Sequence, residues 1–62
     1  MKDIDQTPAV AAYTGLAPKT LENMRWRREG PPYVKLGGRV LYRKVDVDAW
    51  LEQHLVQPRG AA

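Results

Sequence analysis

The chain has 62 residues, enough for one small domain with a modest core. Ten Lys and Arg residues stand against seven Asp and Glu residues, and there is no cysteine, which excludes disulfides and cysteine-based zinc sites. No apolar run approaches the roughly 20 residues of a membrane span, and the N-terminus lacks the apolar core of a signal peptide. We therefore expect a cytoplasmic protein with no membrane partner.

The charges are unevenly distributed along the chain. Eight of the ten cations lie between Lys19 and Lys44, where the only anions are Glu22 and Glu29. A basic middle with more acidic flanks is typical of a surface that faces a polyanion. A net charge of +3 is ordinary for a small domain, so the clustering carries the argument.

The N-terminal half predicts two helices joined by a tight turn. Thr7 is expected as a hydroxyl N-cap followed by proline, which predicts a first helix over 8–14. Gly15 ends this helix, because glycine tolerates the left-handed conformation found at helix ends. A second helix is predicted over 18–29, ended by Gly30 and two prolines. Two helices joined by a short glycine turn are typical of a helix-turn-helix.

The C-terminal half predicts a β-hairpin and a third helix. β-Branched and aromatic residues fill 33–36 and 39–43, on either side of a Gly-Gly pair that suits a two-residue primed turn. An apolar stripe that includes Val47 and Leu51 predicts a helix over 45–56. The expected fold is mainly α with a small β-hairpin, in the order helix-helix-hairpin-helix, which is a winged helix-turn-helix.

One folded domain is expected, over 7–56, between an N-terminal arm at 1–6 and a flexible tail at 57–62. Strand alternation divides the hairpin side chains between two faces. Val34 and Leu36 are expected to complete the core, while Lys35 is expected on the outward face.

Nothing in the chain predicts catalysis. The single histidine, His54, has no metal-ligand partner at motif spacing, and serine is absent. The pair Gly37-Gly38 lies at a hairpin tip rather than between a strand and a helix, so it is not a phosphate-binding loop. A chain of this size also has little room for a concave pocket. We expect a non-enzymatic protein with no metal and no cofactor.

The second helix carries side chains suited to the major groove of double-stranded DNA. Base edges there present mostly hydrogen-bond acceptors, which long donors near the start of a helix can reach. Asn23 can bond adenine in a bidentate manner, and Thr20 can contact a thymine methyl group. Arg25 is also suited to phosphates or to pairing within the protein. The predicted contacts of this recognition helix are Pro18, Lys19, Thr20, Asn23, Arg25 and Arg27.

The hairpin offers a second contact, called the wing here. Two glycines at its tip permit close approach to a sugar-phosphate strand, and a narrow minor groove attracts an arginine such as Arg39. Trp26 is expected to pack half-buried against the hairpin, with packing on DNA sugar and phosphate as the alternative. The predicted wing contacts are Lys35, Gly37, Gly38, Arg39 and Arg43.

A set of short motifs resembles the small excisionase and AlpA-like DNA-binding proteins. These motifs are TPAVAAYTGL (7–16), TLENMR (20–25), GPPYVKLG (30–37), VLYR (40–43) and DVDAWL (46–51). The resemblance covers almost the whole chain and implies a MerR-type winged helix-turn-helix. It departs from the usual pattern at Thr14, Ala17 and Val45, where leucine, serine and a small residue are usual.

Proteins of this kind are recombination directionality factors or transcriptional regulators of mobile elements. A directionality factor bends attachment-site DNA so that an integrase, a tyrosine or serine recombinase, excises the element. The resemblance also implies a bacterial, nucleoid-associated location and head-to-tail self-association on DNA. A transcriptional role through the same surface remains an alternative, and a protein-interaction module such as an antitoxin is another.

Overall fold

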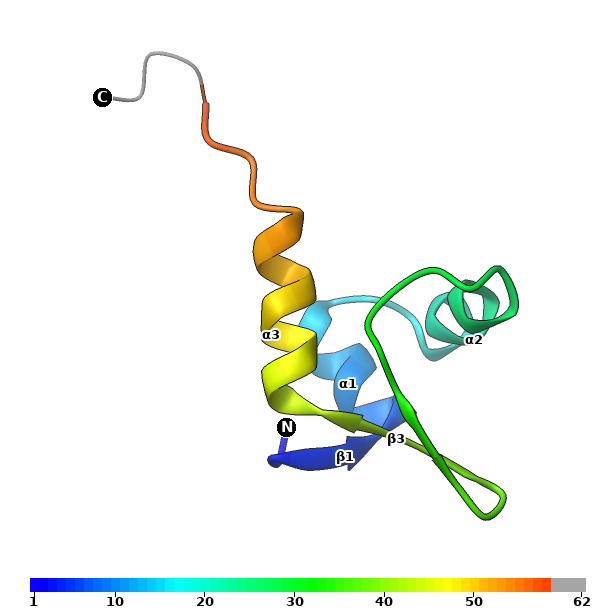
Figure 1. Cartoon of the computed structure of the whole chain (residues 1–62). Coiled ribbons are helices and arrows are strands. Elements are labelled where there is room, and N and C mark those ends of the chain that lie inside the picture. The colour runs from blue at the N-terminus through cyan, green and yellow to red at the C-terminus, as the bar shows by residue number, and fades with distance from the viewer. Residues whose placement is uncertain (59–62) are drawn as a thin grey trace.

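The computed structural model describes residues 1–58, which form three helices and a three-stranded antiparallel sheet (Figure 1). The elements are β1 (Ile4–Gln6), α1 (Thr7–Thr14), α2 (Pro18–Trp26), β2 (Val34–Leu36), β3 (Arg39–Arg43) and α3 (Lys44–Gln53). The predicted fold class and element order are confirmed, with one additional strand at the N-terminus. The expected tail at 57–62 lies largely outside the described residues, because 59–62 are not described.

Strand β1 replaces the last part of the expected N-terminal arm. It pairs with β3, with Ile4 opposite Arg43 and Gln6 opposite Leu41, so the strand order is β1-β3-β2. The Asp5 carboxylate accepts hydrogen bonds from two backbone N–H groups, at 2.9 and 3.0 Å, and these bonds lower its pKa. Three residues show too little alternation to predict a strand, so pairing with β3 defines it.

Helix α1 begins one residue before the predicted position. Gln6 is the N-cap and provides no side-chain cap, so Thr7 is a helical residue and its prediction as the N-cap is wrong. Gly15 has φ of 80°, and its N–H donates to the Ala11 carbonyl at 2.9 Å. The left-handed turn at this glycine is as predicted, and it directs the chain into α2.

Helix α2 ends at Trp26, three residues before the predicted end. The Arg28 N–H donates to the Arg25 carbonyl and the Glu29 N–H donates to the Met24 carbonyl, at 3.1 and 2.7 Å. These two bonds are those of a Schellman C-terminus, in which one residue takes the left-handed conformation. Here that residue is Arg28, with φ of 57°, rather than a glycine. The prediction failed because the side chain gives no signal for this turn.

The hairpin has the predicted two-residue turn. Only Gly37 of the glycine pair has positive φ, at 62°, which is the pattern of a type II′ turn. The register places Leu36 opposite Arg39 and Val34 opposite Leu41. Because directly opposite residues share a face, Val34 and Leu36 lie on the face away from buried Tyr42. They are 40% and 65% exposed, so the prediction that they complete the core is wrong.

The core is small and lies where α1, α2, α3 and β3 meet. Leu16, which follows the glycine turn, packs against it from between α1 and α2. Helix α3 ends at Gln53 rather than at the predicted Val56, because Leu55 and Val56 lie beyond the core and are exposed. None of the three helices in residues 1–58 has the length and apolar character to cross a lipid bilayer. The buried core residues are Val10, Ala11, Leu21, Tyr42 and Val47.

Asp48 ties α3 to α1. Its carboxylate accepts hydrogen bonds from the Tyr13 hydroxyl at 2.6 Å and from the Lys44 ammonium at 3.1 Å. The Tyr13 hydroxyl and then the Lys44 ammonium lower the pKa of Asp48, and the carboxylate raises the pKa of Lys44. This contact fastens α3 to α1, in addition to the direct connection of α3 to β3.

Candidate nucleic-acid interface

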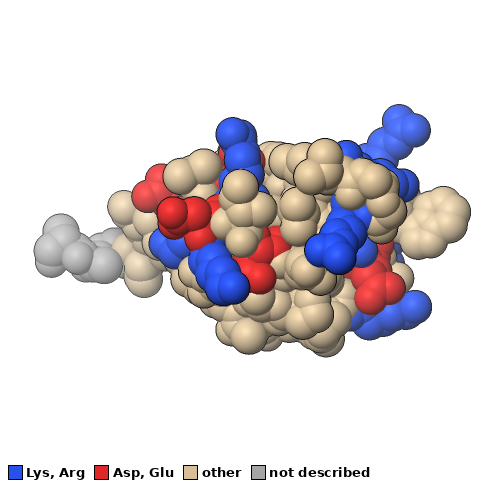
Figure 2. Space-filling model, turned by 90° about the horizontal axis from the view of Figure 1, so that it is seen from below, with Lys and Arg blue, Asp and Glu red and all other residues tan. Residues whose placement is uncertain are grey.

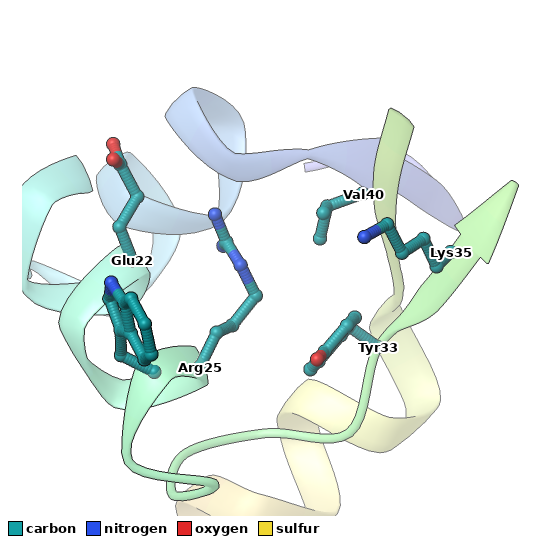
Figure 3. Close-up of a pocket in the computed structure, with 6 residues that line it drawn as sticks. Glu22, Arg25, Tyr33, Lys35 and Val40 are labelled. Carbon is teal, nitrogen blue, oxygen red and sulfur yellow. The ribbon is translucent and has the colours of Figure 1, made fainter. Parts of the chain in front are cut away.

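Helix α2 and the wing flank a shallow groove of about 340 Å³ on one side of the molecule (Figure 3). Figure 1 shows α2 and the hairpin tip projecting on the side away from α3. The structure thus brings the two predicted contact elements together around one surface. The residues that line the groove are Glu22, Arg25, Trp26, Tyr33, Lys35 and Val40.

The outward face of α2 is polar, as a recognition helix requires. Leu21 is fully buried in the core, and residues three and four positions apart share a helix face. Lys19, Glu22 and Trp26 therefore form one exposed stripe on the side opposite Leu21. Asn23, four residues after Lys19, belongs to the same face and is half-buried. The other predicted contacts of this helix are Pro18, which is exposed in its first turn, Thr20, which is half-buried, and Arg27, which is exposed at its C-cap.

Arg25 turns away from the outward face and braces the wing. One guanidinium nitrogen donates to the Tyr42 hydroxyl at 2.7 Å and to the Thr7 hydroxyl at 3.2 Å. The guanidinium carbon also lies 5.9 Å from the centre of the Tyr33 ring, within range of a cation–π interaction. These contacts join α2 to α1 and to β3, and Figure 3 shows the guanidinium between α2 and the hairpin. Pairing of Arg25 within the protein was one of the roles that the sequence suggested, and the structure gives Tyr42 and Thr7 as its hydrogen-bond partners.

Lys35 lies on the groove side of the wing rather than on its outward face. It pairs with Val40 across the hairpin, and both residues line the groove. The predicted outward position of Lys35 is therefore wrong, because the two-residue turn puts it on the same face as Val40. Figure 3 shows its side chain directed across the groove toward α2.

The remaining wing residues divide between the tip and the base. Gly37, Gly38 and Arg39 form the exposed tip. Arg43 lies at the base, where its guanidinium donates to both carboxylate oxygens of Asp46 at 2.6 and 3.0 Å. Hydrogen bonding to Asp46 raises the pKa of Arg43. The structure therefore separates Arg43 from the tip and gives its guanidinium an internal partner.

Trp26 is 86% exposed at the C-terminal end of α2. The prediction that it packs half-buried against the hairpin is wrong, because it belongs to the outward stripe rather than to the core side of the helix. The sequence signal was available: Trp26 follows Lys19 by seven residues, which is two helical turns. Glu22 lies three residues after Lys19 and four before Trp26, which places it on this face too, although it was not among the predicted contacts.

The electrostatics of this side favour an anion. Figure 2 shows several basic side chains projecting on the side of α2 and the hairpin, with one acidic group among them, whereas acidic and basic side chains alternate more evenly toward α3. In the groove itself, Arg25 and Lys35 outweigh the single carboxylate of Glu22. Among residues 1–58, no His, Cys, Asp and Glu side chains are grouped in threes so as to hold a metal ion. The chemistry available is hydrogen bonding and charge pairing with a polyanion.

Comparison with known proteins agrees with this geometry. The profile of the helix-turn-helix domain family matches residues 6–55, which span every helix and the hairpin. No curated protein matches the chain. Domains of this family are typically non-enzymatic, and they use the second helix of the motif for contact with DNA. The chain therefore belongs to the helix-turn-helix domain family and is a DNA-binding protein.

Proposed function

We propose that the chain is an excisionase, a recombination directionality factor that binds and bends attachment-site DNA to promote integrase-mediated excision of a mobile element. In this proposal α2 enters the major groove and the wing enters the neighbouring minor groove, as in MerR-type proteins. The observation that supports it best is the shared groove: α2 and the wing stand on either side of it, held by the Arg25 contacts.

Recognition of sequence is assigned to the first two turns of α2. Lys19 is exposed and able to donate to base or phosphate acceptors, while Thr20 and Asn23 offer shorter polar groups beside it. Pro18 in the first turn brings the helix start close to the DNA, and Arg27 at the C-cap is suited to a phosphate. These side chains have no hydrogen bond to another part of the protein among the described residues.

Contact with the backbone and with the minor groove is assigned to the wing. Arg39 at the tip would insert its guanidinium where a narrow minor groove concentrates negative potential. Gly37 and Gly38 would let the backbone approach a sugar-phosphate strand. Together with Lys35, Lys19 and Arg27, Arg39 brings the cationic contacts to about four. The logarithm of the binding constant should then fall with the logarithm of the salt concentration with a slope, called the salt slope here, of about −3 to −4. Arg43 would join this set only by leaving Asp46.

Bending is proposed to require several copies on one site. A single module of this size buries only about 600–1,000 Å² on DNA, which is small for tight binding. Head-to-tail copies on successive sites would share a bending cost of a few kcal/mol. The partner in this reaction would be the tyrosine or serine recombinase that acts on the same attachment site.

The test combines footprinting on DNA around the native gene with a bending assay and a reconstituted excision reaction. Protection at an attachment site, a bend there and stimulation of excision by the recombinase are the expected results. Protection confined to a promoter, with no effect on excision, would contradict the excisionase proposal and favour a transcriptional regulator. Failure to bind any duplex at low salt would contradict both the excisionase and the transcriptional regulator, and it would favour an interaction module such as an antitoxin.

A further inference from the structure

Trp26 has the largest exposed fraction among the exposed large apolar side chains of residues 1–58. An indole left in water forgoes a substantial hydrophobic stabilisation, of about 1.5–3 kcal/mol for a large apolar side chain. The other tryptophan, Trp50, is half-buried and lies with its ring centre 4.6 Å from that of His54. The two tryptophans thus differ sharply: the Trp50 ring has an aromatic partner, whereas most of the Trp26 side chain is in water.

The position of Trp26 places it where a DNA strand would pass. Trp26 lines the groove from α2. Figure 3 shows Tyr33 and Lys35 on the other side of the groove. An element in the major groove and an element in the adjacent minor groove are separated by one sugar-phosphate strand. If α2 and the wing contact adjacent grooves, that strand runs along the groove that Trp26 borders.

The chemistry of the groove matches such a strand. A phosphate needs cationic donors, and the Lys35 ammonium has no ion-pair partner among the described residues. A deoxyribose presents C–H surface, which an indole face can cover as a planar apolar group. The carboxylate of Glu22 also lines the groove, and Figure 3 shows it directed away from Lys35.

We propose that Trp26 packs against a deoxyribose of the strand between the two contacted grooves, while Lys35 donates to a neighbouring phosphate. This proposal rests on DNA binding by α2 and the wing, and it assigns the groove between them. Because sugars and phosphates carry no sequence information, the contribution of Trp26 is the same on every duplex. It is also independent of salt, since the indole is uncharged.

The experiment measures the DNA affinity of Trp26→Ala, with Trp50→Phe as the matched control. Two duplexes of about 30 base pairs are used: one is selected from a random pool by the wild-type protein, and the other has a scrambled sequence. Trp26→Ala should weaken binding on the order of tenfold on both duplexes, with an unchanged salt slope. Trp50→Phe should leave both affinities unchanged. In the Trp50→Phe background, Trp26 emission should shift to shorter wavelength on either duplex, as expected of an indole leaving water.

Two results would overturn the proposal while leaving DNA binding intact. One is an unchanged affinity for Trp26→Ala together with an unshifted emission. The other is a loss confined to the selected duplex, because that would make Trp26 a reader of bases. Wild-type protein that binds neither duplex would contradict the proposed function, and the role of Trp26 with it. Because Trp26 is exposed, the thermal midpoint of Trp26→Ala should match that of the wild type.

Discussion

The Arg25 guanidinium donates a 2.7 Å hydrogen bond to the hydroxyl of Tyr42, and this bond joins the recognition helix to the wing. Tyr42 is itself fully buried, so the bond attaches α2 to a fixed point of the core. The Thr7 hydroxyl accepts a second bond from the same nitrogen. The spacing of the two DNA-contacting elements is therefore set before DNA binds, which lowers the ordering cost of association.

Replacing Arg25 should weaken DNA binding without removing a phosphate contact. Arg25→Ala is expected to cost about 1.5–3 kcal/mol of unfolding free energy, because hydrogen bonds from a charged group are lost. It should also lower DNA affinity while the salt slope stays unchanged. Chemical denaturation and binding at several salt concentrations measure both effects. A slope that falls by about one would instead identify Arg25 as a phosphate contact, as the sequence suggested.

Asn23 is expected to read a base. Asn23→Ala should cost about 1–3 kcal/mol on the selected duplex and relax preference at one base-pair position. The wild-type protein and the variant are compared on a set of single-base-pair substitutions. Equal loss on every sequence would contradict a base-reading role.

Arg39 at the wing tip is expected to contribute one phosphate or minor-groove contact. Arg39→Ala should reduce the salt slope by about one. Arg43→Ala is the matched control at the base of the same strand, and it should change the slope less because Asp46 already engages that guanidinium. If Arg39→Ala left the slope as it is, the wing tip would not contact DNA.

Arg28 is expected to be a source of strain. A non-glycine residue in the left-handed region costs about 1–2 kcal/mol of stability. Replacement by glycine removes this cost, but glycine loses more backbone entropy on folding, which offsets part of the gain. Arg28→Gly should therefore stabilise the fold by about 0.5–1 kcal/mol in chemical denaturation. Arg28→Ala, which removes the charge and keeps the backbone strain, should give no such gain. Equal stability of the two variants would show that Arg28 is not strained.

Acid should weaken the tie between α3 and α1. The pKa of Asp48 is lowered in the fold, first by the Tyr13 hydroxyl and then by Lys44. A carboxylate with a lowered pKa stabilises the fold above its ordinary pKa, and this stabilisation is lost as pH falls below about 4. Asp48→Asn should therefore show a shallower loss of stability between pH 7 and pH 3 than the wild type. The other carboxyl group with a lowered pKa, Asp5, is present in both proteins and affects them equally. Identical profiles of unfolding free energy against pH would therefore exclude a contribution from Asp48.

Much of the fold could be predicted because a few residues dictate the backbone. Gly15 and the pair Gly37-Gly38 mark the two turns, and both lie where predicted. The face of Lys35 was also within reach, because a two-residue turn requires Leu36 opposite Arg39 and hence Lys35 opposite Val40. Alternation within each strand, without the pairing across the turn, does not define this register.

Other features depend on tertiary contacts that have no local signal. Strand β1 exists because β3 offers it partners, and its three residues alone predict nothing. The end of α2 depends on a left-handed arginine, Arg28, which residue preference would not suggest. The inward turn of Arg25 depends on a hydrogen bond to Tyr42, which is distant in sequence.

The most direct test of the central claim is an amide titration of the labelled protein with the selected duplex at low ionic strength. If α2 and the wing contact adjacent grooves, the amides of 18–27 and 35–39 should shift together, while those of α3 beyond Asp48 remain in place. Shifts confined to one of the two segments, or a spectrum left unchanged by DNA, would contradict it.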